Sequence, residues 1–353
     1  MIKVIYLTAL GDYRLGVVQQ LLQSDSNIKI YAGEEAFDPS IKVLRSETNL
    51  FYPLKNKYLW KRRFLLQIGS ALDAIRADVL ILDLNPRVIN VWFFLLIRKI
   101  LAKRTILWGH AWSRIGGSGV LLRKLISRLA SGLIVYTETQ RQEALEANLN
   151  RLIWAAPNSL YREKDILMQS NSGFPRNNFI YVGRLVEDKK PELMIRAFSK
   201  FKENVTSSCS LSVVGAGPQM PYLKNLVREL NLSADVNFFG HISGMDELRV
   251  HYERAIASIS PGYVGLSITQ SLAFGVPMII AREENHAPEI EAARENFNSM
   301  FFKSDSIEDL SRVIEEFYRD RLRWNDSNRL IREDCSVRYS VEAMAQGILE
   351  ALH

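Results

Sequence analysis

The stretch from Asn178 to Phe201, NFIYVGRLVEDKKPELMIRAFSKF, decides the fold class of this chain. Its opening run, Phe179 to Val182, is apolar and predicts a buried strand. Apolar residues between Leu193 and Phe201 recur three and four positions apart, which predicts an amphipathic helix. Gly183 ends the strand, so the stretch is expected to be one strand-turn-helix unit of an open α/β sheet.

The turn in this stretch carries three basic residues, Arg184, Lys189 and Lys190. They lie before or within the first turn of the predicted helix, where free backbone N–H groups and the helix dipole also favour an anion. A diphosphate fits this arrangement. Taken alone, the pattern is equally typical of a structural turn with solvated charges, so the interpretation depends on the loops that follow.

The length and charge of the chain indicate two domains. A chain of 353 residues exceeds the size at which one hydrophobic core keeps growing. Residues 1–170 contain 24 Lys and Arg against 14 Asp and Glu, a balance of +10, whereas the remainder contains 21 against 25, a balance of −4. We therefore expect the two halves to meet different surroundings or partners.

Three features predict a cytoplasmic protein that is soluble or peripheral to a membrane. The chain begins MIKVIYLTAL, without the basic segment and cleavage site of a signal peptide. Its longest apolar run, Val88–Ile97, is too short to span a bilayer. Cys209 and Cys335 fit neither a metal site nor a disulfide framework, which favours a reducing compartment.

Short apolar runs alternate with helical patterns in both halves, which predicts two parallel sheets. The strands predicted for the first half are Ile2–Leu7, Ile28–Ala32, Val79–Leu84, Thr105–Trp108, Leu133–Tyr136 and Leu152–Ala155. The second half is predicted to contain strands at Phe179–Val182, Leu211–Val214, Val236–Phe239, Ala257–Ser260 and Met278–Ala281, and three final helices from about Ile307, Leu322 and Val341.

A polar linker, residues 159–177, separates the two halves. It predicts domains at 1–165 and 166–335, followed by a last helix at 336–353 that packs back on the first domain. Open α/β sheets bind ligands at the carboxyl ends of their strands, so a cleft shared by the two domains is expected to hold the ligand.

Three further loops of the second half fall at predicted carboxyl ends of strands. Gly215 and Gly217 follow SLSVV, where glycine allows a ligand to approach the backbone closely. Gly240 follows the strand VNF. The most informative loop, SPGYVGLSITQSLAFGVP at 260–277, leads into a helix whose N–H groups can bind phosphate oxygens. Four such loops in one domain favour a diphosphate ligand over a purely structural role.

With these loops, the chain resembles the retaining glycosyltransferases of family 4, which have the GT-B fold. The resemblance rests on YVGRLVEDKKPELMIRAF, SVVGAGP with VNFFGHI, GYVGLSITQSLAFGVPMII and HAPEIEAARENFNSMFF, and more weakly on LWGHAWS, SGLIVYT and APNSLY. It implies two Rossmann-like, doubly wound α/β domains facing a central cleft. It also implies that Arg184 and Lys189 bind the donor diphosphate with Lys190 beside them, and that His110 acts close to the transferred sugar.

The chain departs from this family at two positions. Two glutamates eight residues apart usually flank a Gly-Phe-Gly, and these positions are Gly262 and Gln270 here. Gln270 keeps a carbonyl that can accept a hydrogen bond from the nucleotide ribose, whereas Gly262 cannot replace a glutamate that reaches the sugar. We expect an active variant. The other residues that the resemblance assigns to the donor site are Gly215, Gly217, Gly240, Val264, Gly265, Leu266, Ser267 and Glu289, and those on the acceptor side are Gly11, Asp12 and Arg14.

The first half also carries a basic and aromatic pattern. Residues 51–64, FYPLKNKYLWKRRF, mix cations with aromatic rings, and residues 84–137 contain nine Lys and Arg but no Asp or Glu. This mixture suits the interface of an anionic membrane. A solvated helix face or a single-stranded nucleic acid site would also explain it, but no nucleic-acid-binding motif accompanies it. The residues expected at the membrane are Lys55, Lys57, Trp60, Lys61, Arg62 and Arg63.

Together these features predict a retaining hexosyl- or related transferase of surface polysaccharide biosynthesis, on the inner face of the cell membrane. It is expected to need no cofactor and no metal, since the chain contains no Asp-x-Asp. Its expected partners are a nucleotide-sugar donor, a lipid-linked or lipopolysaccharide-type glycan acceptor and an anionic membrane surface, but no nucleic acid. The alternative is a non-catalytic nucleotide-sugar-binding or assembly protein of the same fold.

Overall fold

The computed structural model describes residues 1–353 apart from 40–41, 113–118, 169–175 and 206–207. The chain divides into unit 1, Met1–Arg162 with Tyr339–His353, and unit 2, Glu163–Arg338. Of the predicted linker, residues 169–175 lie outside the described residues. Along the described part of the chain, no helix combines the length and the hydropathy needed to cross a membrane.

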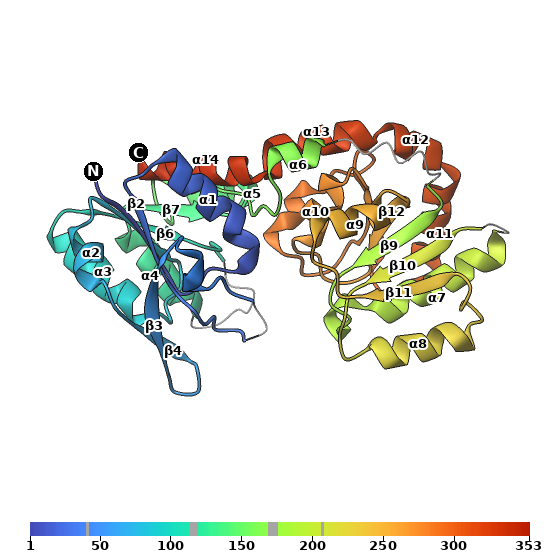
Figure 1. The fold of residues 1–353 in the computed structure, drawn as a ribbon, viewed down its shortest axis with the longest axis horizontal. Coiled ribbons are helices and arrows are strands. Elements are labelled where there is room, and N and C mark those ends of the chain that lie inside the picture. Colours follow the sequence, from blue (N-terminus) through green and yellow to red (C-terminus); the bar gives the residue numbers. More distant parts are fainter. Residues whose placement is uncertain (40–41, 113–118, 169–175, 206–207) are drawn as a thin grey trace. The chain divides into compact units, whose positions relative to one another are not determined.

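Unit 1 is built on an eight-stranded sheet in the order β4-β3-β2-β1-β5-β6-β7-β8 (Figure 1). Its strands are β1 (Lys3–Leu7), β2 (Ile28–Gly33), β3 (Tyr52–Leu59), β4 (Phe64–Ile68), β5 (Val79–Asp83), β6 (Arg104–Trp108), β7 (Gly132–Val135) and β8 (Ile153–Ala155). Neighbouring strands pair parallel, whereas β3 and β4 form an antiparallel hairpin. The six strands predicted for this half are present, but β3 and β4 were not predicted.

Helices cover both faces of this sheet. Successive residues of a strand point to opposite faces, so Ile5 and Leu7 join one core cluster while Val4 and Tyr6 join the other. Helices α1 (Leu15–Ser24) and α14 (Val341–Leu352) cover the first face, and α2 (Ala71–Arg76), α3 (Ile89–Ile100), α4 (Gly119–Leu129) and α5 (Glu138–Glu146) cover the second. Unit 1 is therefore doubly wound, as predicted.

Helix α14 is distant in sequence from the rest of unit 1 but belongs to its core. Met344 and Ile348 are buried in the same cluster as Ile5. A Cβ atom at Gly347 would lie 2.2 Å from the carbonyl oxygen of Ala155, so glycine is what lets the helix approach β8. The buried face of α14 thus contributes to the core of unit 1.

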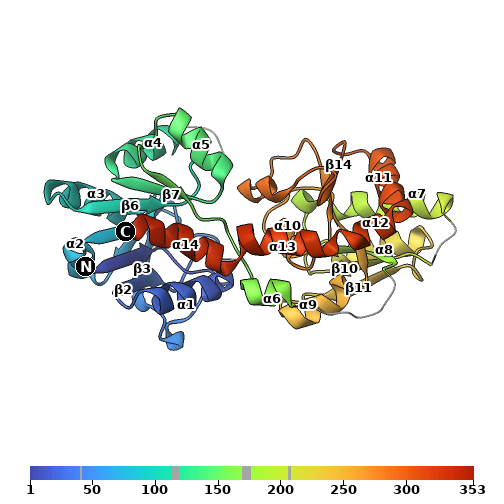
Figure 2. The same ribbon diagram turned by 90° about the horizontal axis from the view of Figure 1, so that it is seen from above.

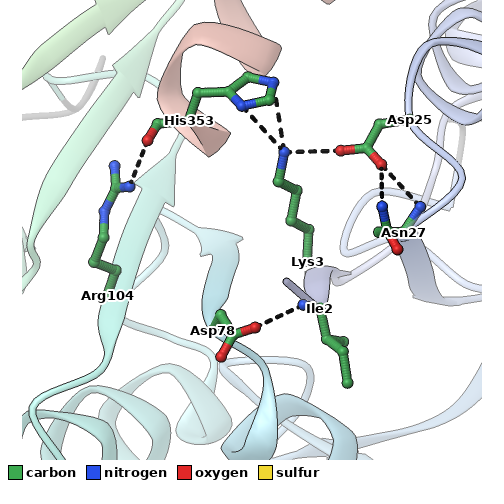
Figure 3. A network of polar contacts seen from close by, with 7 residues as sticks. All are labelled: Ile2, Lys3, Asp25, Asn27, Asp78, Arg104 and His353. Carbon is green, nitrogen blue, oxygen red and sulfur yellow. Dashed lines mark hydrogen bonds and ion pairs between the residues drawn. The ribbon is translucent and has the colours of Figure 1, made fainter.

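Polar contacts at the amino ends of β1 and β6 hold the end of α14 (Figure 3). Arg104 donates a hydrogen bond to the carbonyl oxygen of His353 at 3.1 Å, and Lys3 Nζ lies 3.5 Å from both ring nitrogens of His353. Lys3 also forms an ion pair of 2.8 Å with Asp25, which lowers the pKa of that carboxyl to about 2. Burial of Lys3 is tolerated because its charge is paired.

Unit 2 contains a six-stranded parallel sheet in the order β11-β10-β9-β12-β13-β14. Its strands are β9 (Asn178–Val182), β10 (Ser210–Val214), β11 (Val236–Gly240), β12 (Ala255–Ser260), β13 (Met278–Ala281) and β14 (Ser299–Phe302). Its helices are α6 (Glu163–Leu167), α7 (Pro191–Asn204), α8 (Met220–Glu229), α9 (Met245–Tyr252), α10 (Ser267–Ala273), α11 (Ile307–Arg319), α12 (Arg321–Asp326) and α13 (Asn328–Tyr339). Strand β14 was not predicted, and four helices rather than three finish the chain.

Both faces of this second sheet are also covered. Phe198, Phe317 and other residues of α7, α8, α11 and α12 pack with Ile259 of β12 on one face. On the other, Ser258 Oγ lies 2.7 Å from Ser271 Oγ of α10. The two units are thus Rossmann-like α/β domains, which confirms the predicted fold class.

Candidate functional site

Two loops at the carboxyl edge of the unit 2 sheet pack against each other through their backbones. Gly215, after β10, has φ +150°, and a Cβ atom there would lie 1.8 Å from the carbonyl oxygen of Gly183, after β9. A Cβ atom at Gly217 would lie 2.3 Å from the carbonyl oxygen of Leu185. Glycine at 215 and 217 is therefore required by loop packing, whether or not a ligand approaches.

Gly240, at the end of β11, completes this edge. Its carbonyl oxygen accepts a hydrogen bond of 2.6 Å from the backbone N–H of Gly215. Its φ is +73°, a conformation that glycine adopts without strain, and the position of its absent Cβ faces open space. The loops after β9, β10 and β11 thus form one connected backbone layer.

Gly262, after β12, is packed against the 3-10 helix η3 (Glu187–Lys189). A Cβ atom at Gly262 would lie 2.4 Å from the carbonyl oxygen of Asp188 and 2.9 Å from the carbonyl carbon of Lys189. The N–H of Tyr263 donates to the same Asp188 oxygen at 3.2 Å. Any side chain at position 262 would displace η3, so the backbone itself excludes a glutamate here.

The three predicted cations behave differently from one another. Lys189 Nζ donates a hydrogen bond of 2.6 Å to the carbonyl oxygen of Tyr263 and lies 4.1 Å from the centre of that ring. Arg184 is exposed at the end of β9. Lys190 forms ion pairs of 2.5 Å with Glu284 and 2.6 Å with Asp305.

The ion pairs of Lys190 change its suitability for a phosphate. Although partial burial opposes the effect, its hydrogen bonds to Asp305 and Glu284 raise the pKa of Lys190. The ammonium is therefore charged but already faces two carboxylates, whose negative charge also repels an anion. Of the predicted cations, Arg184 and Lys189 are better placed than Lys190 to meet a diphosphate.

His286, which the sequence did not single out, holds the β12–α10 loop in place. Its Nδ1 accepts a hydrogen bond of 3.1 Å from the backbone N–H of Val264, while its Nε2 lies 2.7 Å from the carbonyl oxygen of Ala281 at the end of β13. This pattern requires the neutral ring with the proton on Nε2. Burial lowers the pKa of His286, which favours that neutral form. A histidine just after a predicted strand was the available signal.

Near the start of α10, some of the predicted donor residues are buried and others are partly exposed. Val264 is fully buried, and Glu289, on the 3-10 helix η4 (Pro288–Ala292), is also buried. The partly exposed residues along this turn and helix are Gly265, Leu266, Ser267 and Gln270. Of the predicted donor residues along this segment, the partly exposed group is the one that solvent reaches.

In unit 1, predicted acceptor-side and catalytic residues meet at Tyr136, directly after β7. The ring of His110, after β6, lies edge-on to Tyr136 with 4.6 Å between ring centres. Arg14, in the 3-10 helix η1 (Asp12–Arg14), donates to the Tyr136 hydroxyl at 2.8 Å and lies 4.4 Å above the ring of Trp108. Arg14, His110 and Tyr136 thus form one cluster, in which Tyr136 and Trp108 were missed as site residues.

Neighbouring groups fix this cluster and leave donors unsatisfied. Arg123 of α4 donates to the carbonyl oxygens of His110, at 2.7 Å, and Leu84, at 2.8 Å. Within the described residues, the buried atoms Arg14 Nε and Trp108 Nε1 have no hydrogen-bond acceptor. Buried donors without a partner are costly, so we expect water or a ligand oxygen to reach them.

Gly11 and Asp12 precede this cluster. A Cβ atom on Gly11 would lie 2.4 Å from the ring of Tyr13. The backbone N–H of Asp12 donates a hydrogen bond of 3.0 Å to the carbonyl oxygen of Lys42. The Asp12 side chain is exposed. Gly11 is buried, whereas Asp12 opens the 3-10 helix η1 that carries Arg14.

The residues predicted for a membrane surface lie on the β3–β4 hairpin rather than on a helix. Lys55, Lys57, Trp60, Lys61 and Arg63 are exposed, and Trp60 at the tip is 71% exposed. Arg62 differs from them. It lies 3.7 Å above the ring of Tyr58 and donates to the Ala36 carbonyl oxygen at 2.5 Å, so it stabilises the hairpin.

Comparison with known families gives a match over unit 2. Residues 163–334 match the family described as "Glycosyl transferases group 1". The matched segment is nearly the whole of unit 2, Glu163–Arg338, and contains the loops predicted to bind the donor.

Curated relatives match at low identity, and two of the three matches span less than half of the relative. An exopolysaccharide phosphotransferase of Streptomyces coelicolor is 29% identical over 72% of this chain, but the match covers only 26% of that protein. An uncharacterized glycosyltransferase of Haemophilus influenzae is 24% identical over 69% of each chain. The putative glycosyltransferase EpsD of Bacillus subtilis is 25% identical over 51% of this chain and 45% of its own.

Solved structures match along the whole chain. HepE of Anabaena in complex with UDP has a TM-score of 0.73 and 15% identity, over 100% of this chain and 99% of its own. The lipopolysaccharide outer core galactosyltransferase WaaB, in its apo form, has a TM-score of 0.70 and 13% identity over 99% of each chain. At such identities the likeness shows the fold, which is GT-B. The family match and this fold together support a glycosyltransferase.

Proposed function

We propose that this GT-B protein is a retaining glycosyltransferase that moves a sugar from a nucleoside diphosphate to a lipid-linked or lipopolysaccharide-type glycan. It works on the inner face of the cell membrane, in surface polysaccharide biosynthesis. It needs neither a cofactor nor a metal, and nucleic acid is not a partner.

The observation that carries this proposal is the arrangement of cations and backbone in unit 2. Lys189 donates a hydrogen bond to the loop that leads into α10, and exposed Arg184 lies in the loop directly after the adjacent strand β9. A diphosphate leaving the anomeric carbon gathers negative charge, and fixed cations stabilise it without rearranging. The planar guanidinium of arginine can donate hydrogen bonds to two phosphate oxygens at once, whereas the lysine ammonium acts as a point charge. The two residues therefore have distinct roles.

The glycine at position 262 does not argue against catalysis. Its space is filled by the backbone of η3, so the missing carboxylate follows from how the loops pack. Because position 262 offers no nucleophile, an oxygen of the departing diphosphate takes the acceptor proton in our proposal. The carbonyl of Gln270 accepts a hydrogen bond from the ribose, and His110 contacts the transferred sugar. The edge-on ring of Tyr136 and the hydrogen bond from Arg123 to the His110 carbonyl oxygen hold His110 in position.

Two observations favour a membrane-associated glycan as acceptor. The names of matched proteins refer to exopolysaccharide and to the lipopolysaccharide outer core. The exposed hairpin of unit 1 presents Trp60 with Lys55, Lys57, Lys61 and Arg63, which suits anionic lipid.

The test begins with the donor. Nucleotide sugars are screened by thermal shift, since a ligand that binds the folded state raises its apparent stability. The donor found is then incubated with membranes, and release of nucleoside diphosphate is followed over time. Steady release that depends on membranes is expected. Binding of a donor without release would favour the non-catalytic alternative, and stabilisation by none of the nucleotide sugars would overturn the proposal.

A further inference from the structure

Helix α3 is apolar on the side that faces away from its own core. Ile89, Phe93, Leu96 and Ile100 follow one another at spacings of four, three and four residues, so they form one stripe along the helix. Their side chains are 36%, 49%, 54% and 84% exposed, respectively. The opposite side, with Phe94, is fully buried in the unit 1 core. A helix that is apolar all round is normally buried on every side, so something beyond unit 1 is expected to cover this stripe.

Helix α4 extends the apolar surface. It lies next to α3 on the same face of the sheet (Figures 1 and 2). Leu121 is 74% exposed, Leu122 46% and Leu125 49%. Exposed apolar side chains that gather on two neighbouring helices are typical of an interaction site. We call the exposed residues of the two helices the α3–α4 face: Ile89, Phe93, Leu96, Ile100, Leu121, Leu122 and Leu125.

The charged residues of the two helices that form the α3–α4 face are all basic. Residues 84–137, which include both helices, contain no Asp or Glu. Lys99 is exposed beside Ile100, while Lys124 and Arg128 follow Leu121 along α4 at three and seven residues. Arg98 is different, since it is fully buried and donates to backbone carbonyl oxygens such as that of Ala74. The cations that border the face thus have no acidic neighbour along either helix.

We infer that the α3–α4 face inserts into an anionic membrane, with its aliphatic side chains at the boundary of headgroups and acyl chains. Lys99, Lys124 and Arg128 then lie at the level of the lipid phosphates. An apolar face with basic edges is what helices lying in a membrane interface present. A second copy of this chain fits less well, because two such faces would bring like charges together. Nucleic acid fits less well because Phe93 is the one aromatic ring among the seven residues of the face, which leaves little surface for base stacking.

The membrane-facing hairpin is tied to the same helix. Arg87, just before α3, donates to the carbonyl oxygens of Arg62 at 2.5 Å and Arg63 at 2.9 Å in the hairpin tip. Asn90 exchanges hydrogen bonds with the backbone of Gln67 in β4. The hairpin therefore adds its cations to a platform in which the α3–α4 face supplies the apolar contact.

This inference rests on the proposed function only in its choice of a lipid-bearing acceptor. The test is co-sedimentation of the full chain with vesicles made of equal parts phosphatidylglycerol and phosphatidylcholine. The variant Ile100→Gln with Leu121→Gln removes the two most exposed side chains of the face. Its control is Leu322→Gln with Val337→Gln, in α12 and α13 of unit 2, whose side chains are 74% and 73% exposed. Either pair removes little buried surface, so both variants should fold.

The face variant is expected to lower vesicle partitioning at least about tenfold, while the control stays within about twofold of wild type, because only the face loses inserted apolar area. Wild-type binding should weaken with salt without vanishing, since salt screens the cations and leaves the apolar contact. Lys99→Gln with Lys124→Gln should reduce the salt dependence in part, because Arg128 and the hairpin cations remain. Should the face pair fail to fold, Leu121→Gln against Leu322→Gln gives the same comparison at equal exposure.

Equal partitioning of the face and control variants overturns the inference. The inference is also overturned if the wild type self-associates without binding vesicles and the face variant abolishes this self-association, which would assign the face to a second copy. Binding of the wild type to oligonucleotides alone would overturn it as well. Thermal shift with nucleotide sugars is measured on the same proteins. Vesicle binding without donor binding would refute the proposed function but not the membrane role of the α3–α4 face. Donor binding without vesicle binding would refute the membrane role but not the proposed function.

Discussion

Replacing Gly262 with alanine tests whether packing, rather than lost chemistry, explains the glycine. The new Cβ atom would lie 2.4 Å from the Asp188 carbonyl oxygen, where ordinary van der Waals contact begins at 3.4 Å. Either η3 or the β12–α10 loop must therefore move by about 1 Å. Overpacking of this kind costs about 1 to 3 kcal/mol. For a domain of this size that corresponds to a fall in Tm of roughly 2 to 12 °C.

A control for this variant lies three residues away in the same loop. A Cβ atom at Gly265 would come no closer than 3.6 Å to another atom, and that atom is in the Tyr263 side chain. Gly265→Ala should therefore leave Tm nearly unchanged. The assay is thermal unfolding followed by circular dichroism, with and without the donor identified by screening.

The Gly262 variant should also bind donor more weakly, because movement of η3 shifts Lys189 away from the Tyr263 carbonyl oxygen. Gly262→Glu, which restores the family's usual residue, should be at least as destabilised as Gly262→Ala. If Gly262→Glu folds with wild-type Tm and gains activity, the packing argument is wrong and the glycine reflects a genuine loss of a catalytic group.

Three further predictions concern single side chains. Arg184→Ala should weaken nucleoside diphosphate binding by more than about tenfold, because one charge-assisted contact is lost. The control Arg319→Ala, at an exposed arginine of α11, should leave binding unchanged. Equal Kd values for wild type and Arg184→Ala in calorimetry would refute the assignment. His110→Ala should lower kcat by roughly 10² or more with little change in donor affinity, and a wild-type rate with the true acceptor would exclude this role. Because burial lowers the pKa of His286 below its ordinary value of 6.5, the unfolded chain binds more protons as pH falls below 6.5; the free energy of unfolding should therefore be level above that pH and decrease below it. His286→Gln keeps an acceptor for the Val264 N–H and a donor for the Ala281 carbonyl oxygen but does not titrate. It should therefore remove this part of the acid-side slope, and an unchanged slope would contradict the role.

Much of the fold could be predicted because buried parallel strands are continuous apolar runs. Strands β1, β5, β9 and β10 are examples, each preceded or followed by a helical pattern. The hairpin strand β3, YPLKNKYL, is largely exposed and mixes lysines with aromatic rings, so it lacks both the apolar run and a regular alternation. β3 lies between β2 and the edge strand β4, and a largely exposed hairpin of this kind carries little sequence signal.

The candidate site was predictable only where one loop contains the whole signal. Arg184 and Lys189 lie within the stretch that also predicts the strand and helix. The partners of Lys190, Glu284 and Asp305, are 94 and 115 residues away in sequence, so its ion pairs depend on the tertiary fold. The same holds for Gly262, whose meaning depends on how close η3 lies.

For two other site residues, His286 and Tyr136, the sequence pattern did not predict the role that the structure shows. His286 stands in a segment that matched the family, but its role follows from two backbone contacts that only the folded loops create. Tyr136 was taken as the last residue of a strand, and its ring proves to join Arg14 and His110. Side-chain direction at the end of a strand is set by neighbouring strands, which a single sequence does not give.

The most direct test of the proposed function is single-turnover release of nucleoside diphosphate from the identified donor, in the presence of acceptor-bearing membranes, by wild type and by Arg184→Ala. The account predicts release by wild type that requires the acceptor and yields a glycosylated lipid, and a much slower release by the variant at equal protein stability. Release at the same rate by both proteins, or donor binding by wild type with no transfer to any glycan lipid, would contradict it.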